Sequence, residues 1–226
     1  MEFRLLFTGS MKSGQGHGVA AEKHAIRKSI HKQLATLWQV VPDLKMRSVA
    51  HSILSAPPTT GTPGQVGFTV TMAAATHRES LWKTLGDNFD RCGYKFVPLV
   101  SKQLNLTCGL DVLLLQRDGA SPLRRAADGT DIDNRLKTLF DALQVPQNCQ
   151  EIPDGVKEAD EEPYFFCLVE DDCLVTDVKV TTDKWLAPYS PPPGPGAAHP
   201  ENFVHAVITV NVRPSVFSFE NLAFVT

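Results

Sequence analysis

The sequence predicts an α+β fold, a single domain with a mixed β-sheet flanked by helices. The chain has 226 residues, which suits one sizeable domain with its own core. Its hydrophobic content of 42% and charged content of 21% are those of a soluble globular protein, and no apolar run approaches the roughly 20 residues needed to span a bilayer. Segments with strand-like alternation are interleaved with segments of helical spacing, and no internal repeat is visible.

Local patterns place the elements in chain order. Alternating apolar residues predict strands at residues 2–8, 66–72, 94–101, 106–116, 173–182 and 202–212. Apolar residues at helical spacing predict helices at residues 19–38, 79–89 and 132–144. The intervening loops include the Pro/Gly/Thr-rich segment 55–64 and the proline-rich loop 188–200.

Charge divides the chain into an N-terminal basic part, 1–127, and a second part, 128–226. Residues 1–128 carry 16 Lys and Arg against 9 Asp and Glu, whereas residues 129–226 carry 6 against 16. Much of this acidity lies in an insertion, residues 145–168. The asymmetry predicts two electrically different surfaces, one of which could meet nucleic acid; chance combined with solubility is the simpler alternative.

The cysteines and the N-terminus favour a reducing cytoplasm. Five cysteines form no CxxC pair, and their odd number and wide spacing predict neither a disulfide scaffold nor a zinc site. The first ten residues, MEFRLLFTGS, lack the apolar segment of a secretory signal.

The helix DIDNRLKTLFDAL, residues 131–143, opens with two aspartates. Its apolar residues predict a core-facing stripe, with Lys137 one turn after Asp133 on its edge. Residues two apart on a helix point in nearly opposite directions, so Asp131 and Asp133 could share a ligand only if Asp131 precedes the helix proper. Two interpretations stay open, since aspartates at a helix start also satisfy free N–H groups and the helix dipole.

A second carboxylate cluster precedes the strand in VEDDCLVTDVKV, residues 169–180. Glu170, Asp171 and Asp172 stand together, so they need either free solvation or a cation. Magnesium prefers hard oxygen ligands such as carboxylates, waters and phosphate oxygens. The two clusters could converge on one magnesium site, with Lys137 placed to steady a phosphate or the attacking water.

Together, these two motifs resemble the RusA family of Holliday-junction resolvases. The family's pattern is a D-[LIV]-D-N-x-x-K-x-x-x-D-A-L helix followed by a D-D-x-x-[IV] strand, and residues 128–186 match it well. The resemblance implies a homodimeric, magnesium-dependent endonuclease of branched DNA, with Mn²⁺ as a substitute ion. It implies that Asp131, Asp133 and Asp172 bind the metal, that Asp171 lies beside it, and that Lys137 is the catalytic lysine.

Basic residues supply the expected DNA contacts. Arg124 and Arg125 form a basic approach to the motif helix. The helix at 19–38 carries Lys23, Arg27, Lys28 and Lys32 on one broad side, as either a phosphate-contacting face or an ordinary solvated face. His17, His24 and His31 repeat every seven residues on this helix and are expected to be solvated.

The resulting hypothesis is a magnesium-dependent endodeoxyribonuclease acting on branched DNA in recombination or repair. Asp131, Asp133 and Asp172 are expected to share one or two cations, and the acidic insertion is expected to be mobile and to oppose duplex DNA. Two alternatives stay open. One is a nucleic-acid-binding accessory, phage or defence protein on the same fold, and the other is a magnesium phosphohydrolase of small nucleotides.

Overall fold

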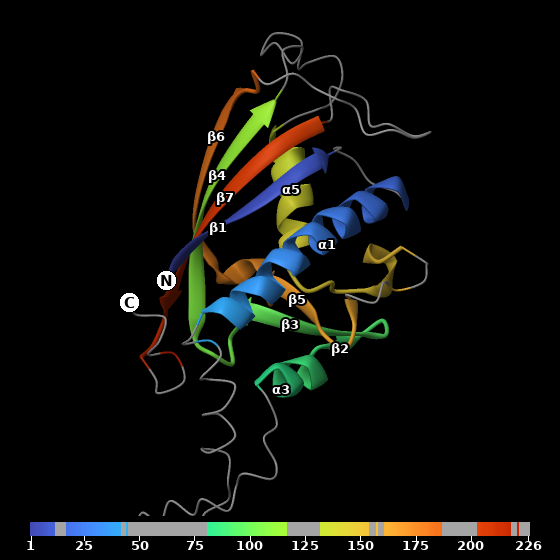
Figure 1. Cartoon of the computed structure of the whole chain (residues 1–226), viewed down its shortest axis with the longest axis vertical. Helices are drawn as coiled ribbons and strands as arrows, with labels where there is room; N and C mark the ends of the chain where they lie inside the picture. The colour runs from blue at the N-terminus through green and yellow to red at the C-terminus, as the bar shows by residue number, and fades with distance from the viewer. Residues whose placement is uncertain are drawn as a thin grey trace, which may run out of the picture.

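The computed structural model shows an α+β domain built on two mixed sheets (Figure 1). The structure describes residues 1–11, 17–41, 44, 81–116, 132–153, 157, 161–186, 203–217 and 221. The segments 55–64, 66–72 and 188–200, for which loops and a strand are predicted, lie outside these residues.

The larger sheet has four strands in the order β1-β7-β4-β6. Its strands are β1 (Glu2–Ser10), β4 (Leu106–Gln116), β6 (Val175–Lys184) and β7 (Phe203–Pro214). β7 pairs antiparallel with both β1 and β4, whereas β4 and β6 are parallel. In β7, alternate side chains from Val204 to Val212 are buried, as expected for a sheet with one face on the core.

The smaller sheet has the order β2-β3-β5. β2 (Asp90–Arg91) and β3 (Tyr94–Val100) form a hairpin, and β5 (Phe165–Val169) runs parallel to β3. All five residues of β5 are buried. Neither β2 nor β5 is among the predicted strands, because β2 is very short and β5 has no alternation of buried and exposed residues to reveal it.

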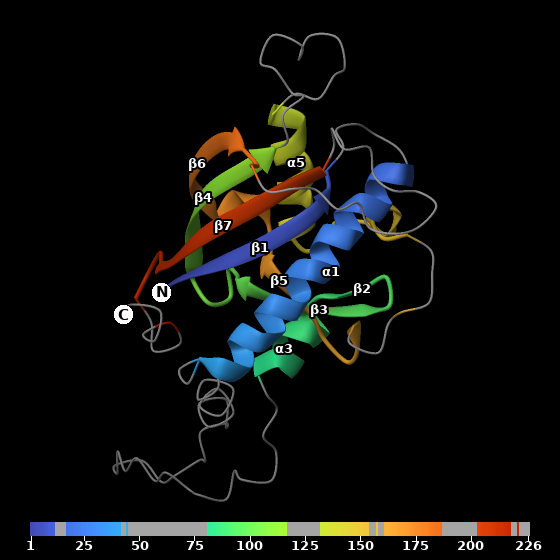
Figure 2. The same ribbon diagram turned by 45° about the horizontal axis from the view of Figure 1, so that its top comes forward.

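Three α-helices complete the described fold: α1 (His17–Val40), α3 (Leu81–Asn88) and α5 (Ile132–Leu143). α1 lies between strand β1 and the smaller sheet (Figures 1 and 2), and it packs on β1, β5 and α5. Ile26, Ile30, Leu34 and Trp38 of α1 are almost fully buried, so this helix forms the centre of the core. These three helices and five of the seven described strands, β1, β3, β4, β6 and β7, agree with the predicted ranges within a few residues.

A disulfide joins Cys92, in the turn between β2 and β3, to Cys149. Cys149 is the first residue of η2 (Cys149–Glu151), a 3₁₀ turn within the acidic insertion. The number and spacing of the cysteines, which predicted no disulfide scaffold, therefore gave no sign of this single bond. The two partners are 57 residues apart, and sequence spacing alone does not show that their Cα atoms lie 5.4 Å apart.

Candidate carboxylate site and the basic helix

The start of α5 presents a carboxylate and a lysine to solvent. Asp133 lies in the first turn of α5 and is exposed, and Lys137, one turn later, is exposed as well. Asp133 therefore has room for a ligand, and it also lies where a helix dipole favours negative charge. Asp131, Arg124 and Arg125 lie outside the described residues.

The buried face of α5 differs from the predicted apolar stripe. Arg135 and Thr138 are buried together with Leu139, Ala142 and Leu143. Ile132, Leu136 and Phe140, which were predicted to face the core, are only partly buried. The helix is therefore rotated so that a guanidinium and a hydroxyl enter the interior, and the Thr138 hydroxyl donates to the Asn134 carbonyl at 3.1 Å.

The second carboxylate cluster has its own partners. Oε2 of Glu170 accepts from the backbone N–H of Lys102 at 2.9 Å, and Nζ of Lys102 lies 3.8 Å from Oδ2 of Asp171. Asp171 caps the 3₁₀ turn η4 (Asp172–Leu174) by accepting from the N–H of Cys173 at 3.0 Å. Bonds from the Cys173 side chain and backbone, with the charge of Lys102, lower the pKa of Asp171. Backbone donors and a lysine thus offset much of the repulsion for which the sequence suggested a cation.

The structure does not bring Asp133 and Asp172 together. The backbone N–H of Asp172 donates to Oε1 of Gln144 at 3.2 Å, and Gln144 directly follows the end of α5. Asp133 is in the first turn of that helix, so the rise of 1.5 Å per residue places it about 16 Å from Gln144 along the axis. Oxygen atoms that bind one Mg²⁺ ion lie within about 4 Å of each other. In this conformation Asp133 and Asp172 cannot share an ion, contrary to the sequence-based expectation.

Three basic residues of α1, Lys23, Arg27 and Lys28, lie against acidic residues of other elements. Nζ of Lys23 lies 2.6 Å from Oδ2 of Asp141, and Nζ of Lys28 lies 3.0 Å from Oε1 of Glu161. Arg27 is 1% exposed, and it donates to the Asp141 carbonyl at 2.9 Å. The prediction of a DNA-contacting face therefore fails for Arg27 as folded, whereas Lys32 is exposed.

Two of the α1 histidines are buried and not solvated as predicted. Nδ1 of His31 accepts from the backbone N–H of Phe166 at 2.8 Å, and its ring stacks on Phe165. Nε2 of His24 lies 3.9 Å from Oε1 of Glu161. The sequence alone does not distinguish a polar helix residue that faces a strand edge from one that faces solvent.

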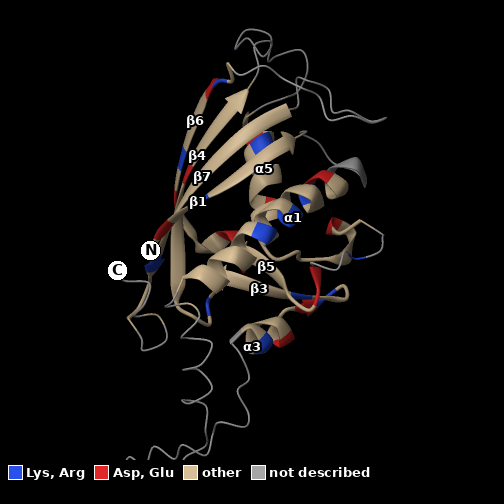
Figure 3. Cartoon of the chain, in the orientation of Figure 1, with Lys and Arg blue, Asp and Glu red and all other residues tan. Residues whose placement is uncertain are grey.

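Ion pairs within the fold thus balance part of the charge asymmetry of the sequence. The basic residues of α1, from the first half, pair with Asp141, Glu151 and Glu161 from the second half. Figure 3 shows residues of both signs along α1 and along β6. Sequence reasoning missed Glu151 and Glu161 as partners of α1, although the high density of acids in the insertion was the signal for them.

Comparisons with known proteins give no relative: no protein-family model matches the chain, and no match was found among curated proteins or solved structures. Within the described ranges, no group of three or more His, Cys, Asp or Glu side chains is arranged to hold a metal ion. Of the helices that the structure describes, none is long and apolar enough to cross a membrane.

Proposed function

We propose that this protein is a metal-dependent endodeoxyribonuclease whose reactive centre lies at the start of α5. The observation that carries the proposal is the D-x-D-N-x-x-K motif, whose residues Asp133 and Lys137 are exposed one turn apart on a helix that the motif predicts. The order of a motif helix followed by a carboxylate pair and a strand, α5 then β6, also agrees with the resemblance to the RusA family.

The proposed ligand set is narrower than the one the resemblance implies. Asp172 lies at the opposite end of α5, so no step is assigned to it. Asp131 and Asp133 are the remaining carboxylates, and Mg²⁺ commonly takes one or two protein carboxylates with waters and phosphate oxygens. Bound there, the ion would polarise a phosphodiester group and activate water.

The chain's own residues have separate roles in this proposal. Asp133 carries negative charge at the exposed start of α5, where a cation from solvent can reach it. Lys137 supplies a cation one turn away that can bind a phosphate oxygen of the substrate. The proposal also includes DNA as the substrate, branched DNA in particular, and Mg²⁺ as the ion, with Mn²⁺ as a substitute. It further includes a homodimer and a cytoplasmic location. Because the protein has a disulfide, its cysteines no longer support the cytoplasmic location.

The test is cleavage of labelled four-way junction, flap, duplex and single-stranded DNA and of RNA, with and without Mg²⁺. Asp133→Asn is expected to lower the Mg²⁺-dependent rate at least 100-fold. Because the side chain is exposed, the variant should lose no more than about 1 kcal/mol of stability, the contribution of an acid at a helix start. Asp183→Asn, an exposed carboxylate of β6, is the matched control. Equal rates for both variants would contradict the proposal.

A second function, DNA binding without cleavage, is favoured by the separation of Asp133 from Asp172. A protein of this kind would bind junctions in the same assay and leave them intact with either ion. Hydrolysis confined to small nucleotides would instead identify a phosphohydrolase.

A further inference from the structure

The part of the acidic insertion that precedes β5 is fastened to the smaller sheet by a covalent bond and by polar contacts. The disulfide joins the exposed Cys149 to Cys92, a non-glycine residue with a φ of 54° in the hairpin turn. Next to it, Nη1 of Arg91 donates to the Pro146 carbonyl at 3.2 Å, and Nζ of Lys157 donates to the Gly93 carbonyl. The β2–β3 turn is therefore the anchor of this segment.

From this anchor, the insertion places two carboxylates against α1. Oε2 of Glu151 lies 4.0 Å from Nη2 of Arg27, and Oε1 of Glu161 lies 3.0 Å from Nζ of Lys28. Glu161 is 3% exposed, and its Oε2 accepts from the Tyr94 hydroxyl at 3.2 Å. Breaking such a buried pair is unfavourable because it leaves a charge without its partner. Glu161 is therefore a specific part of the interface between the insertion and α1.

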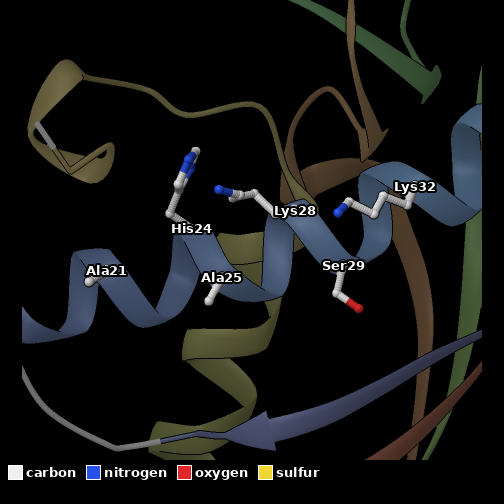
Figure 4. Close-up of a pocket in the computed structure, with 6 residues that line it drawn as sticks. All are labelled: Ala21, His24, Ala25, Lys28, Ser29 and Lys32. Carbon is white, nitrogen blue, oxygen red and sulfur yellow. The ribbon is translucent and has the colours of Figure 1, made fainter. Parts of the chain in front are cut away.

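The covered side of α1 is where anions could otherwise bind. Figure 4 shows His24 and Lys28 extending from α1 on the side where the chain that follows α5 passes. The helix borders a hollow of about 500 Å³ lined by Ala21, His24, Ala25, Lys28, Ser29 and Lys32. Glu151 and Glu161 of the insertion both lie against this helix, so the insertion brings negative charge to this place. A polyanion that approaches Lys28 must compete with Glu161.

We propose that the insertion is an autoinhibitory anionic cover of α1, and that the Cys92–Cys149 disulfide is its redox-sensitive lock. A dithiol reductant attacks one sulfur, the S–S bond breaks, and two thiols form while the dithiol becomes a disulfide, with two electrons and two protons transferred. The exposure of Cys149 makes it accessible to the reductant. Reduction removes the covalent link and lets Glu151 and Glu161 move away from α1, so that Arg27 and Lys28 each lose one carboxylate neighbour. The choice of DNA as the polyanion rests on the proposed function.

The lock is tested by amide hydrogen exchange of the full-length protein before and after reduction. We expect the backbone amides of residues 149–152 and 161–162 to lose protection on reduction, and Cys149→Ser to show the reduced pattern without reductant. Cys173→Ser, which removes an exposed free thiol and keeps the disulfide, should respond to reductant as the wild type does. Unchanged protection of these residues after complete reduction, verified by thiol alkylation and mass measurement, would overturn the lock.

The cover is tested by binding of a fluorescent DNA duplex and of heparin over a range of salt concentrations. Reduction should tighten binding on the order of tenfold at 50 mM salt and steepen the plot of log K against log salt by about 1 to 2, as expected for one or two more phosphate contacts. Glu151→Gln should give part of this gain while the disulfide stays intact. If reduction lowers the amide protection of the insertion but does not change polyanion binding, the proposal that the insertion inhibits binding at α1 is wrong. Redox-dependent binding without Mg²⁺-dependent cleavage would support the cover and contradict the nuclease.

Discussion

At the scale of single residues, Asp171 shows how a predicted metal neighbour can have a structural role. Its carboxylate caps η4, and bonds from Cys173 hold its pKa below the ordinary value of 3.8. A carboxyl group whose pKa is lowered by folding stabilises the folded state when it is ionised. This contribution is complete above the unfolded-state pKa and is lost as the pH falls through the folded-state pKa.

The corresponding prediction concerns acid stability. Asp171→Asn keeps a side chain that can cap the turn but cannot ionise. The wild type should be the more stable of the two at pH 6, and the difference should shrink as the pH falls below the ordinary pKa of 3.8. Urea unfolding at several pH values measures it. A difference that is constant down to pH 2 would mean that this carboxyl titrates alike in both states.

His31 has an equally specific role, since it accepts the Phe166 N–H at the edge of β5. His31→Phe keeps an aromatic ring against Phe165 but leaves this buried N–H without its acceptor. We expect a loss of about 1 to 3 kcal/mol in the free energy of unfolding, measured by urea denaturation. Amide exchange at Phe166 should accelerate more than at Val169; equal acceleration would show general loosening instead.

At the scale of elements, α1 closes an edge of each sheet. While His31 binds β5, the Gln33 side chain accepts from the Leu6 N–H at 2.8 Å and donates to the Leu6 carbonyl at 2.6 Å on β1. Unpaired edge strands are prone to pair with other chains. One helix thus protects two strand edges and fixes the spacing of the two sheets.

This role predicts the effect of Gln33→Leu. The variant loses both bonds to Leu6, so it should be destabilised by about 1 to 2 kcal/mol and should expose the β1 edge to faster exchange. Gln39→Leu, at an exposed position six residues later on α1, is the matched control. Light scattering should show more self-association for Gln33→Leu than for Gln39→Leu; equal values would contradict the edge-protecting role.

At the scale of the whole molecule, the proposed nuclease activity has a consequence for assembly. The resemblance to junction resolvases implies two active sites that act on opposing strands, which requires a symmetric dimer. The mass measured by light scattering at micromolar concentration should be twice the 24.8 kDa of one chain. A monomer at that concentration would argue against paired cleavage and for single nicks or an accessory role.

The amino-acid sequence by itself determined the elements whose signals are local. The helical spacing of residues 132–143 and the alternation of residues 106–116 predicted α5 and β4, because side-chain periodicity depends only on near neighbours. The motif also singled out Asp133 and Lys137, which the structure places together on the exposed side of α5.

Only the tertiary structure decided the relations between distant segments. It pairs Lys28 with Glu161, joins Cys92 to Cys149, and places the length of α5 between Asp133 and Asp172. These contacts depend on how β3, β5 and α1 pack, and residue spacing carries no information about such packing. A helix is also rigid, so its rise of 1.5 Å per residue separates two motifs that the sequence suggests could converge.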